Sequence, residues 1–268
     1  MKMVASAKLH HAQGAIGNML PYSEKLHGIL DHLLKEGASV SSPLLSSNSK
    51  KVTVVAFSSN SSLCGAFNSN AVRNVLKLLD KLLSEGTERE DIYIYAVGKK
   101  VAEALRKAGY NIYKDFSHLV DKPSYEEAAS LGNELADSFA AGETGRVLLC
   151  YNHYESNSHQ PPMEETYLPL SISRCNDEPE DGALPDEIIL EPDAESLVEV
   201  LIPKVMLLKI YTVAMDSYAA ENAARTVAMQ LASDNAEKLL EELNLEYNKR
   251  RQQAITNELL DIVGGTMA

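Results

Sequence analysis

Residues 204–263 read KVMLLKIYTVAMDSYAAENAARTVAMQLASDNAEKLLEELNLEYNKRRQQAITNELLDIV, sixty residues without glycine or proline. As a single α-helix, rising about 1.5 Å per residue, this stretch would be about 90 Å long. A compact globule of the whole chain would be only about 50 Å across. We therefore expect the helix to project beyond any core that the chain forms, and a projecting helix needs a partner.

The side chains of this stretch predict how the helix packs. Eight of the residues from Ala214 to Ala236 are alanine, which lets a second backbone approach closely. Apolar and small residues recur every three or four positions, as in a packed helix. The first track is Met206, Ile210, Val213, Ser217, Ala220, Ala224, Val227 and Leu231, and a displaced second track is Ala228, Ala232, Ala236, Leu239, Leu243 and Tyr247. The drift between the tracks argues against a strict heptad zipper.

Polar residues fill the other face of the same helix. They are Asp216, Glu221, Arg225, Gln230, Glu241 and Glu242. The alternative to one long helix is two helices with a break, at residues 233–235 or at Asn244.

Composition sets the broad class. The chain has 268 residues, is 45% apolar and 24% charged, and has a net charge of −13. No stretch approaches the roughly twenty apolar residues of a membrane span, and no targeting peptide is recognisable. Ten acidic side chains and one basic one fall in residues 174–199, which with Pro179 and Pro185 predict a solvated loop. We expect no nucleic-acid partner, no metal and no cofactor.

The middle of the chain alternates between strand and helix patterns. After an amphipathic helix over 1–35, kinked at Pro21, and a Ser/Pro-rich linker from Ser39 to Ser49, a largely parallel sheet covered by helices is predicted. The expected strands are Val52–Phe57, Ile92–Val97, Asn111–Tyr113, Val147–Tyr151 and Glu165–Leu170, and the expected helices are Ala66–Leu83, Lys99–Ala108 and Tyr125–Ala141. The fold class is α/β, with a Rossmann-like domain and two terminal helices.

This sheet carries no nucleotide-binding motif. Residues 58–65, after the first strand, read SSNSSLCG, which does not match GxGxxG. Around Gly98-Lys99, Tyr93 replaces the first glycine of a P-loop and Lys100 replaces its hydroxyl residue. The sheet is thus interpreted as a structural platform and not as a catalytic domain.

The cysteines and histidines offer one catalytic alternative. Cys64 could act as a nucleophile in the loop after the first strand, but no histidine and carboxylate are placed for a triad. Packing at the end of the strand is the preferred interpretation. The seven histidines include no i,i+4 pair that would bind a metal.

Motifs at both ends carry a family resemblance. Residues 1–13, MKMVASAKLHHAQ, resemble an internal stretch of the gamma subunit of F-type ATP synthase, and residues 63–68, LCGAFN, resemble its LCGGFN loop. The C-terminal signature of that family is similar to ENAAR at 221–225, ASDNA at 232–236 and the residues around Tyr247 to Thr256. The likeness covers essentially the whole chain.

The resemblance implies a rotor. In that family the first and last helices form an antiparallel coiled coil inside a hexamer of alpha and beta subunits, and the α/β domain lies near the ion-driven c-ring. The implied role is a non-catalytic central-stalk subunit that couples proton flow to ATP synthesis. The implied partners also include an epsilon or delta-type stalk subunit, and the implied place is the cytoplasmic face of a bacterial inner membrane, without membrane insertion.

Partner contacts are expected at both ends of the helical pair. The positions matching Arg251 and Gln252 touch a loop of the catalytic subunit in the family, and Lys2 and Lys8 would face acidic segments of the same subunits or be simply solvated. The full set of expected contact residues is Met1, Lys2, Lys8, Arg251, Gln252, Thr256, Glu258 and Ile262.

The sequence departs from the family pattern in three places. The family's chain begins upstream of the position of Met1, so we expect either a truncated or mis-started chain or a tip that is ordered only in a complex. His10 and His11 replace two basic residues, and residues 60–62, NSS, replace Asp-Arg-Gly, so an ion pair made there is expected to be absent.

The expected domains are an N-terminal helix over 1–38, an α/β domain over 50–190 and a C-terminal helix over 194–268. Two other functions stay open at this point: a stand-alone coiled-coil adaptor, and a small α/β enzyme that uses Cys64.

Overall fold

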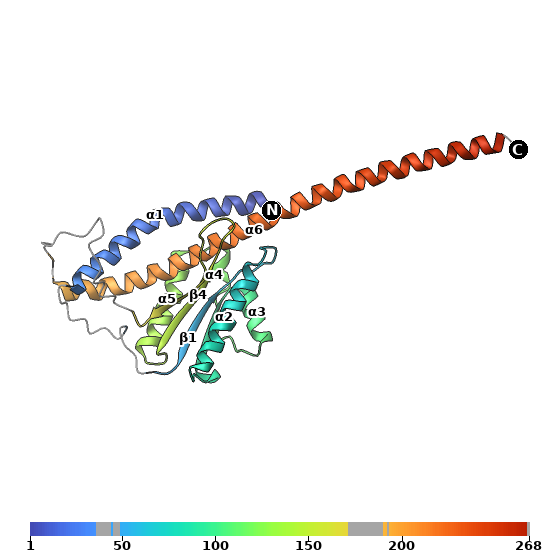
Figure 1. The fold of residues 1–268 in the computed structure, drawn as a ribbon. Coiled ribbons are helices and arrows are strands. Elements are labelled where there is room, and N and C mark those ends of the chain that lie inside the picture. The colour runs from blue at the N-terminus through green and yellow to red at the C-terminus, as the bar shows by residue number, and fades with distance from the viewer. Residues whose placement is uncertain (36–43, 45–48, 171–189, 192, 267–268) are drawn as a thin grey trace.

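The computed structural model describes residues 1–35, 44, 49–170, 190–191 and 193–266. Two helices, α1 (Lys2–Lys35) and α6 (Ala194–Thr266), lie side by side, and an α/β domain packs against α6 (Figure 1). The expected linker lies outside the described residues except for Leu44 and Ser49, and the expected acidic loop lies outside them up to residue 189. The last residues of that loop, 194–199, are instead the start of α6.

A five-stranded sheet forms the centre of the α/β domain. Its strand order is β3-β2-β1-β4-β5. Strands β1, β2, β3 and β4 run parallel to one another, and β5 pairs antiparallel with β4 at one edge. The bounds are β1 Val52–Phe57, β2 Ile92–Val97, β3 Lys114–Asp115, β4 Arg146–Asn152 and β5 Pro162–Leu168.

Two predicted strands are placed differently. The prediction of a strand at Asn111–Tyr113 is wrong, because the ladder with β2 begins only where Tyr95 pairs with Lys114. Before that point Tyr113 makes a single backbone bond, donating from its N–H to the carbonyl of Ile94 at 2.8 Å. Strand β5 starts three residues earlier than predicted and stops before Pro169, which has no N–H to donate.

The strand residues alternate between two buried faces. On one face, Val55 and Phe57 of β1 share a core with Leu149 of β4, and on the other, Val54 and Ala56 share a second core with neighbouring strands. Because these strands are buried on both faces, their sequences are almost continuously apolar.

Helices cover both faces of the sheet. Helices α2 (Phe67–Ser84) and α3 (Lys99–Lys107) cover one, while α5 (Tyr125–Ala140) and the first part of α6 cover the other. Two short elements were not predicted, the 3-10 helix η1 (Arg89–Asp91) and helix α4 (His118–Asp121).

Helix α6 is continuous over 73 residues, so the alternative of a break at residues 233–235 or Asn244 is excluded. Asp193 caps its start, accepting hydrogen bonds from the backbone N–H of Ser196 at 2.8 Å and from its hydroxyl at 2.9 Å. These bonds lower the pKa of Asp193. Helix α1 likewise runs unbroken through Pro21, with a gentle curve (Figure 1).

Helices α1 and α6 run antiparallel. Leu26, Leu30 and Leu33, late in α1, share a core with residues early in α6 such as Val198 and Ile202. Leu9 and Ala12, early in α1, pack with a later group of α6 residues: Met215, Ala219 and Ala223.

Residues of the first predicted track of α6 pack in cores that include the α/β domain. Met206, Ile210 and Val213 belong to the core under the sheet. Ala220 packs on Cys64 and Phe67 of the domain, while the adjacent Ala219 packs on α1. Both faces of this part of α6 are therefore buried, each by a different neighbour.

Candidate partner-contact site

The free part of α6 begins just beyond the point where the start of α1 lies against it. Lys2 of α1 donates a hydrogen bond to the side chain of Gln230, which in turn donates to Asp234 at 2.6 Å. From Leu231 to Ile262 every residue except Asp234 is exposed. The 36 residues from Leu231 to Thr266 correspond to a free rod of about 54 Å, which Figure 1 shows extending away from the rest of the molecule.

Large apolar side chains lie exposed along this free rod. Leu245 is 72% and Tyr247 is 65% exposed, values normal for polar surface residues. The others are Leu231, Leu239, Leu240, Leu243, Ile255, Leu259, Leu260 and Ile262. So large an exposed apolar surface on one helix marks a protein–protein contact region.

Seven of the eight expected contact residues fall into two groups that the structure does not bring together. Met1 and Lys2 lie at the start of α1, beside Gln230. The distal group lies on α6 more than twenty residues farther along, which corresponds to about 30 Å of helix. It consists of Arg251, Gln252, Thr256, Glu258 and Ile262, all exposed.

Within the distal group, helical spacing separates two faces. Arg251, Glu258 and Ile262 are spaced by seven and four residues and share one face, while Gln252 and Thr256 share the adjacent one. The Thr256 hydroxyl donates to the carbonyl of Gln252 at 2.8 Å. A partner that surrounds the rod could touch both faces at once.

Lys8 takes a different position from the other expected contacts. Its ammonium group lies 5.9 Å from the centre of the Tyr218 ring, on the side of α6 that carries Glu221. The side chain therefore already has neighbours within the chain, although the residue is exposed.

A set of polar contacts fixes the α/β domain to α6, and the sequence analysis missed it. The carboxylate of Asp216 accepts a hydrogen bond from the ring of His153 at 2.7 Å and another from the backbone N–H of Tyr154 at 2.9 Å. The hydroxyl of Tyr154 accepts from Gln13 of α1 at 2.7 Å. One loop after β4 thus holds both long helices.

A second contact joins α6 to the loop after β1. Arg225 forms an ion pair of 2.7 Å with Glu221 and donates to the hydroxyl of Ser61 at 2.8 Å. Glu221 is only 6% exposed. Burial raises its pKa, and the nearby Arg225 guanidinium opposes that shift.

Asp216 and Arg225, on the polar face of α6, thus contact the α/β domain. Helical periodicity shows which residues share a face but not which neighbour covers it. The only sequence signal for these contacts was the resemblance of residues 221–225, ENAAR, to the C-terminal signature of the family. At residues 60–62, where the family carries Asp-Arg-Gly, the charged Arg225 donates to the uncharged hydroxyl of Ser61.

The open crevice of the sheet is occupied by the chain itself. In a doubly wound sheet, ligands bind beyond the carboxyl ends of the strands where the strand order reverses, here between β1 and β4. The loops after these two strands are the ones that hold α6, through Ser61 and through His153 and Tyr154.

Backbone N–H groups at the start of α3 also already have hydrogen-bond acceptors within the chain. Val101 donates its N–H to the Ser58 hydroxyl at 3.0 Å, and Lys99 donates its N–H to Asn60 at 3.1 Å. Gly98 has a φ of 126°, and a Cβ there would lie 2.4 Å from the carbonyl oxygen of Ser58. The amides that would hold a phosphate in a P-loop therefore bind the β1 loop instead.

Cys64 is buried, with 1% exposure, in the core that joins the β1 loop to Ala220. Its sulfur accepts a hydrogen bond from Asn68 at 3.1 Å. The packing interpretation of Cys64 fits this environment. Among the described residues, no three His, Cys, Asp or Glu side chains are grouped as a metal site, and no helix is long and apolar enough to span a membrane.

The fold and the contact surface together define a class of protein: a helical shaft with an α/β domain fixed to one end and a free helix at the other. Solved structures share this fold. The chain resembles the Tetrahymena thermophila mitochondrial ATP synthase central stalk/c-ring structure, with a TM-score of 0.59 and 21% identity over 87% of this chain and 97% of the other. For the Euglena gracilis mitochondrial ATP synthase the TM-score is 0.58, with 20% identity over 98% of this chain and 95% of the other.

Sequence comparisons give the family. The family model described as ATP synthase matches residues 1–268. The ATP synthase gamma chain of Phocaeicola vulgatus is 49% identical, over 100% of this chain and 92% of the relative, and that of Bacteroides fragilis is 50% identical over the same shares. The chain belongs to the ATP synthase gamma chain family.

Proposed function

We propose that this chain is the central-stalk rotor subunit of a proton-translocating F-type ATP synthase. The observation that carries the proposal is the division of α6 into two parts. Its first part is packed by α1 and the α/β domain, and its last 36 residues are free and rich in exposed apolar side chains.

Rotation requires that the driven end and the working end move as one body. The contacts of Asp216 with the β4 loop and of Arg225 with the β1 loop resist slippage between α6 and the domain. The paired helices stiffen the shaft where torque enters. Exposed leucines on the free rod suit an apolar bearing, because dispersion and hydrophobic contacts lack the directionality that would lock one angle.

The proposed partners follow from this arrangement. The free rod, with Arg251, Gln252, Thr256, Glu258 and Ile262, would contact the alpha and beta subunits, and Met1, Lys2 and Lys8 would contact the same hexamer nearer the domain. The α/β domain would bind the c-ring and an epsilon or delta-type stalk subunit. The complex would lie on the cytoplasmic face of a bacterial inner membrane.

The chain itself would carry no catalytic site, so its contribution to ATP synthesis would be mechanical. We also propose the expected division into residues 1–38, 50–190 and 194–268 as its functional parts.

Reconstitution tests the proposal. The purified chain is mixed with the alpha and beta subunits of its own organism, and assembly is measured by size-exclusion chromatography with light scattering. We expect one copy of this chain per hexamer. A chain that elutes alone and leaves ATP hydrolysis by the hexamer unchanged would point to an adaptor function instead.

A further inference from the structure

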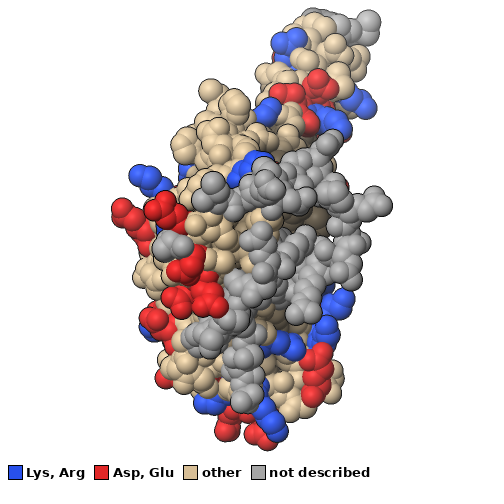
Figure 2. Space-filling view, turned by 90° about the vertical axis from the view of Figure 1, so that its left-hand side faces the viewer, with Lys and Arg blue, Asp and Glu red and all other residues tan. Residues whose placement is uncertain are grey.

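The charges of the α/β domain are divided between the two faces of its sheet. Helices α2 and α3, on one face, carry seven basic and two acidic side chains, although the whole chain has a net charge of −13. Helix α5, on the opposite face, carries four acidic side chains and no basic one. Acidic side chains also gather along one flank in the view of Figure 2. The α2/α3 face is thus basic in an acidic protein.

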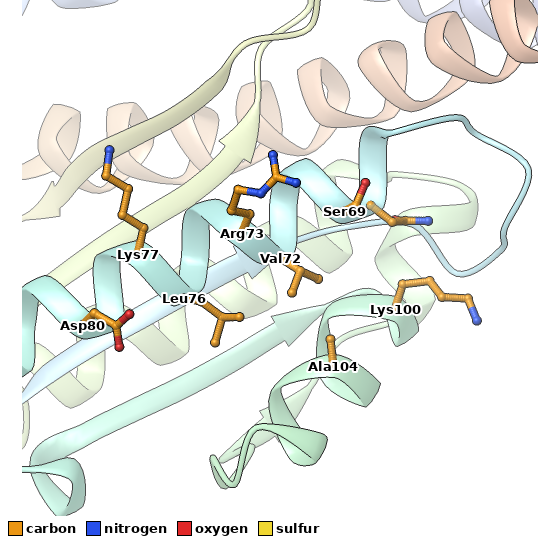
Figure 3. A pocket seen from close by; sticks show the side chains of 9 residues that line it. Ser69, Val72, Arg73, Leu76, Lys77, Asp80, Lys100 and Ala104 are labelled. Atoms are coloured by element: carbon orange, nitrogen blue, oxygen red, sulfur yellow. The ribbon is translucent and has the colours of Figure 1, made fainter.

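An open groove of about 660 Å³ runs along this basic face (Figure 3). Its floor is apolar and consists of Val72 and Leu76 of α2 and Ala104 of α3. These three side chains are only partly buried. An apolar strip that the chain leaves half covered gains stability when a partner covers it.

Cations border the floor of the groove. Arg73 and Lys77 extend from α2, and Lys100 extends from the start of α3. Arg73 and Lys77 make no ion pair with any residue that the structure describes, whereas Lys100 lies 3.2 Å from Glu103. Among the described residues that line the groove, Asp80 is the only acidic one. The border therefore favours an anionic partner.

We propose that this groove, the α2/α3 groove, docks an acidic amphipathic helix from a neighbouring subunit of the assembly. Its lining along α2 runs from Asn68 to Asp80, a length of about 18 Å, which accommodates roughly twelve residues of helix. A helix with apolar residues at positions i, i+3 and i+4 would cover Val72 and Leu76 and bring its carboxylates to Arg73 and Lys77. The groove is formed by two helices and offers no free strand edge for β-pairing.

The inference rests on the proposed function only in placing the partner within the same complex. Photo-cross-linking of the intact ATP synthase tests the groove proposal and the proposed function separately. The photoreactive residue p-benzoylphenylalanine replaces Leu76 in one variant and Leu240, on the free rod, in a second. After irradiation, cross-linked peptides are identified by mass spectrometry.

We expect Leu76→p-benzoylphenylalanine to cross-link to a segment of another subunit that is net acidic and has helical apolar spacing. A cross-link to lipid, to a basic segment, or to nothing would overturn the α2/α3 groove proposal. If the Leu240 variant still cross-links to the alpha or beta subunits, the proposed function survives that failure. If neither position cross-links to a subunit of the complex, the proposed function fails as well.

Charge reversal provides an independent readout. The triple change Arg73→Glu, Lys77→Glu, Lys100→Glu is expected to lower the cross-link yield from Leu76 at least tenfold. The matched control is Lys99→Glu with Lys107→Glu, on α3 but outside the groove lining, which should leave the yield within twofold. Equal losses in both variants would mean that general charge, and not the groove, attracts the partner.

Discussion

The carboxylate of Asp216, in the first third of α6, lies 2.7 Å from Nδ1 of His153, in the loop after β4. The same carboxylate accepts the N–H of Tyr154 at 2.9 Å, so one side chain joins the shaft to the sheet. If torque passes between the α/β domain and the rod, this contact lies on its path.

Removal of Asp216 should loosen this junction. Asp216→Ala leaves the N–H of Tyr154 without its acceptor, and we expect the free energy of unfolding to fall by about 1–3 kcal/mol. Asp216→Asn, which retains an oxygen acceptor, should lose less. Urea denaturation of the isolated chain measures both. A loss no greater than that of Glu237→Ala, on the free rod, would show that the contact adds nothing to stability.

Close packing between α1 and α6 should tolerate no added volume. Ala219 is fully buried against Leu9 and Ala12, so Ala219→Leu should destabilise the chain by about 1–3 kcal/mol through overpacking. Ala232→Leu is the matched control, because Ala232 is exposed on the free rod and the change there should stay within about 0.5 kcal/mol. Similar melting temperatures for the two variants would contradict the antiparallel packing described above.

Glu221 should make stability depend on pH. Because burial raises its pKa in the folded chain, the folded state binds this proton more tightly than the unfolded state does. The resulting stabilisation is complete below the unfolded pKa, about 4.3, and is lost as the pH rises through the folded pKa. Glu221→Gln does not titrate, so the stability of the original chain relative to this variant should fall as the pH rises from about 4.

Denaturation at several pH values checks this direction. Lys8 and Asp121 also act on Glu221, with opposite effects on its pKa. If the original chain instead gained stability over Glu221→Gln as the pH rose, attraction to Arg225 would outweigh burial.

The distal rod should be dispensable for folding and required for assembly. Arg251→Ala with Gln252→Ala is expected to leave the melting temperature unchanged, since both residues are exposed and far from the core. Coupled ATP synthesis in membrane vesicles should fall. Lys107→Ala with Lys122→Ala also changes two exposed residues, but on the α/β domain, and should retain coupling. If Arg251→Ala with Gln252→Ala unfolded the α/β domain, these two residues could not lie on a free rod away from the core.

The sequence was sufficient to predict the long helix, because sixty residues without glycine or proline leave few other structures. The central strands were also predictable, since Val52–Phe57 and Ile92–Val97 are short apolar runs between turns. The face of α6 that α1 covers was not predictable. Ala219 and Ala220 are identical side chains about 100° apart on the helix, and only the three-dimensional structure shows that one meets α1 and the other the β1 loop.

The contacts of the α/β domain with α6 escaped prediction for a related reason. Asp216 and His153 are 63 residues apart in the chain, and no local pattern links them. Strand β3 was misplaced because two residues of pairing are too few to produce an alternating pattern. The contact roles of Met1, Lys2, Lys8 and the distal residues stay predictions.

Direct observation of rotation tests the central claim. The hexamer is fixed to a surface, and a bead is attached to the α/β domain through Met163→Cys, which is 41% exposed, while Cys64 and Cys150 are buried and Cys175 is replaced by serine. With ATP present, the account predicts continuous rotation of the bead in one direction. A bead that stays bound and shows only random angular motion while the hexamer hydrolyses ATP would contradict it.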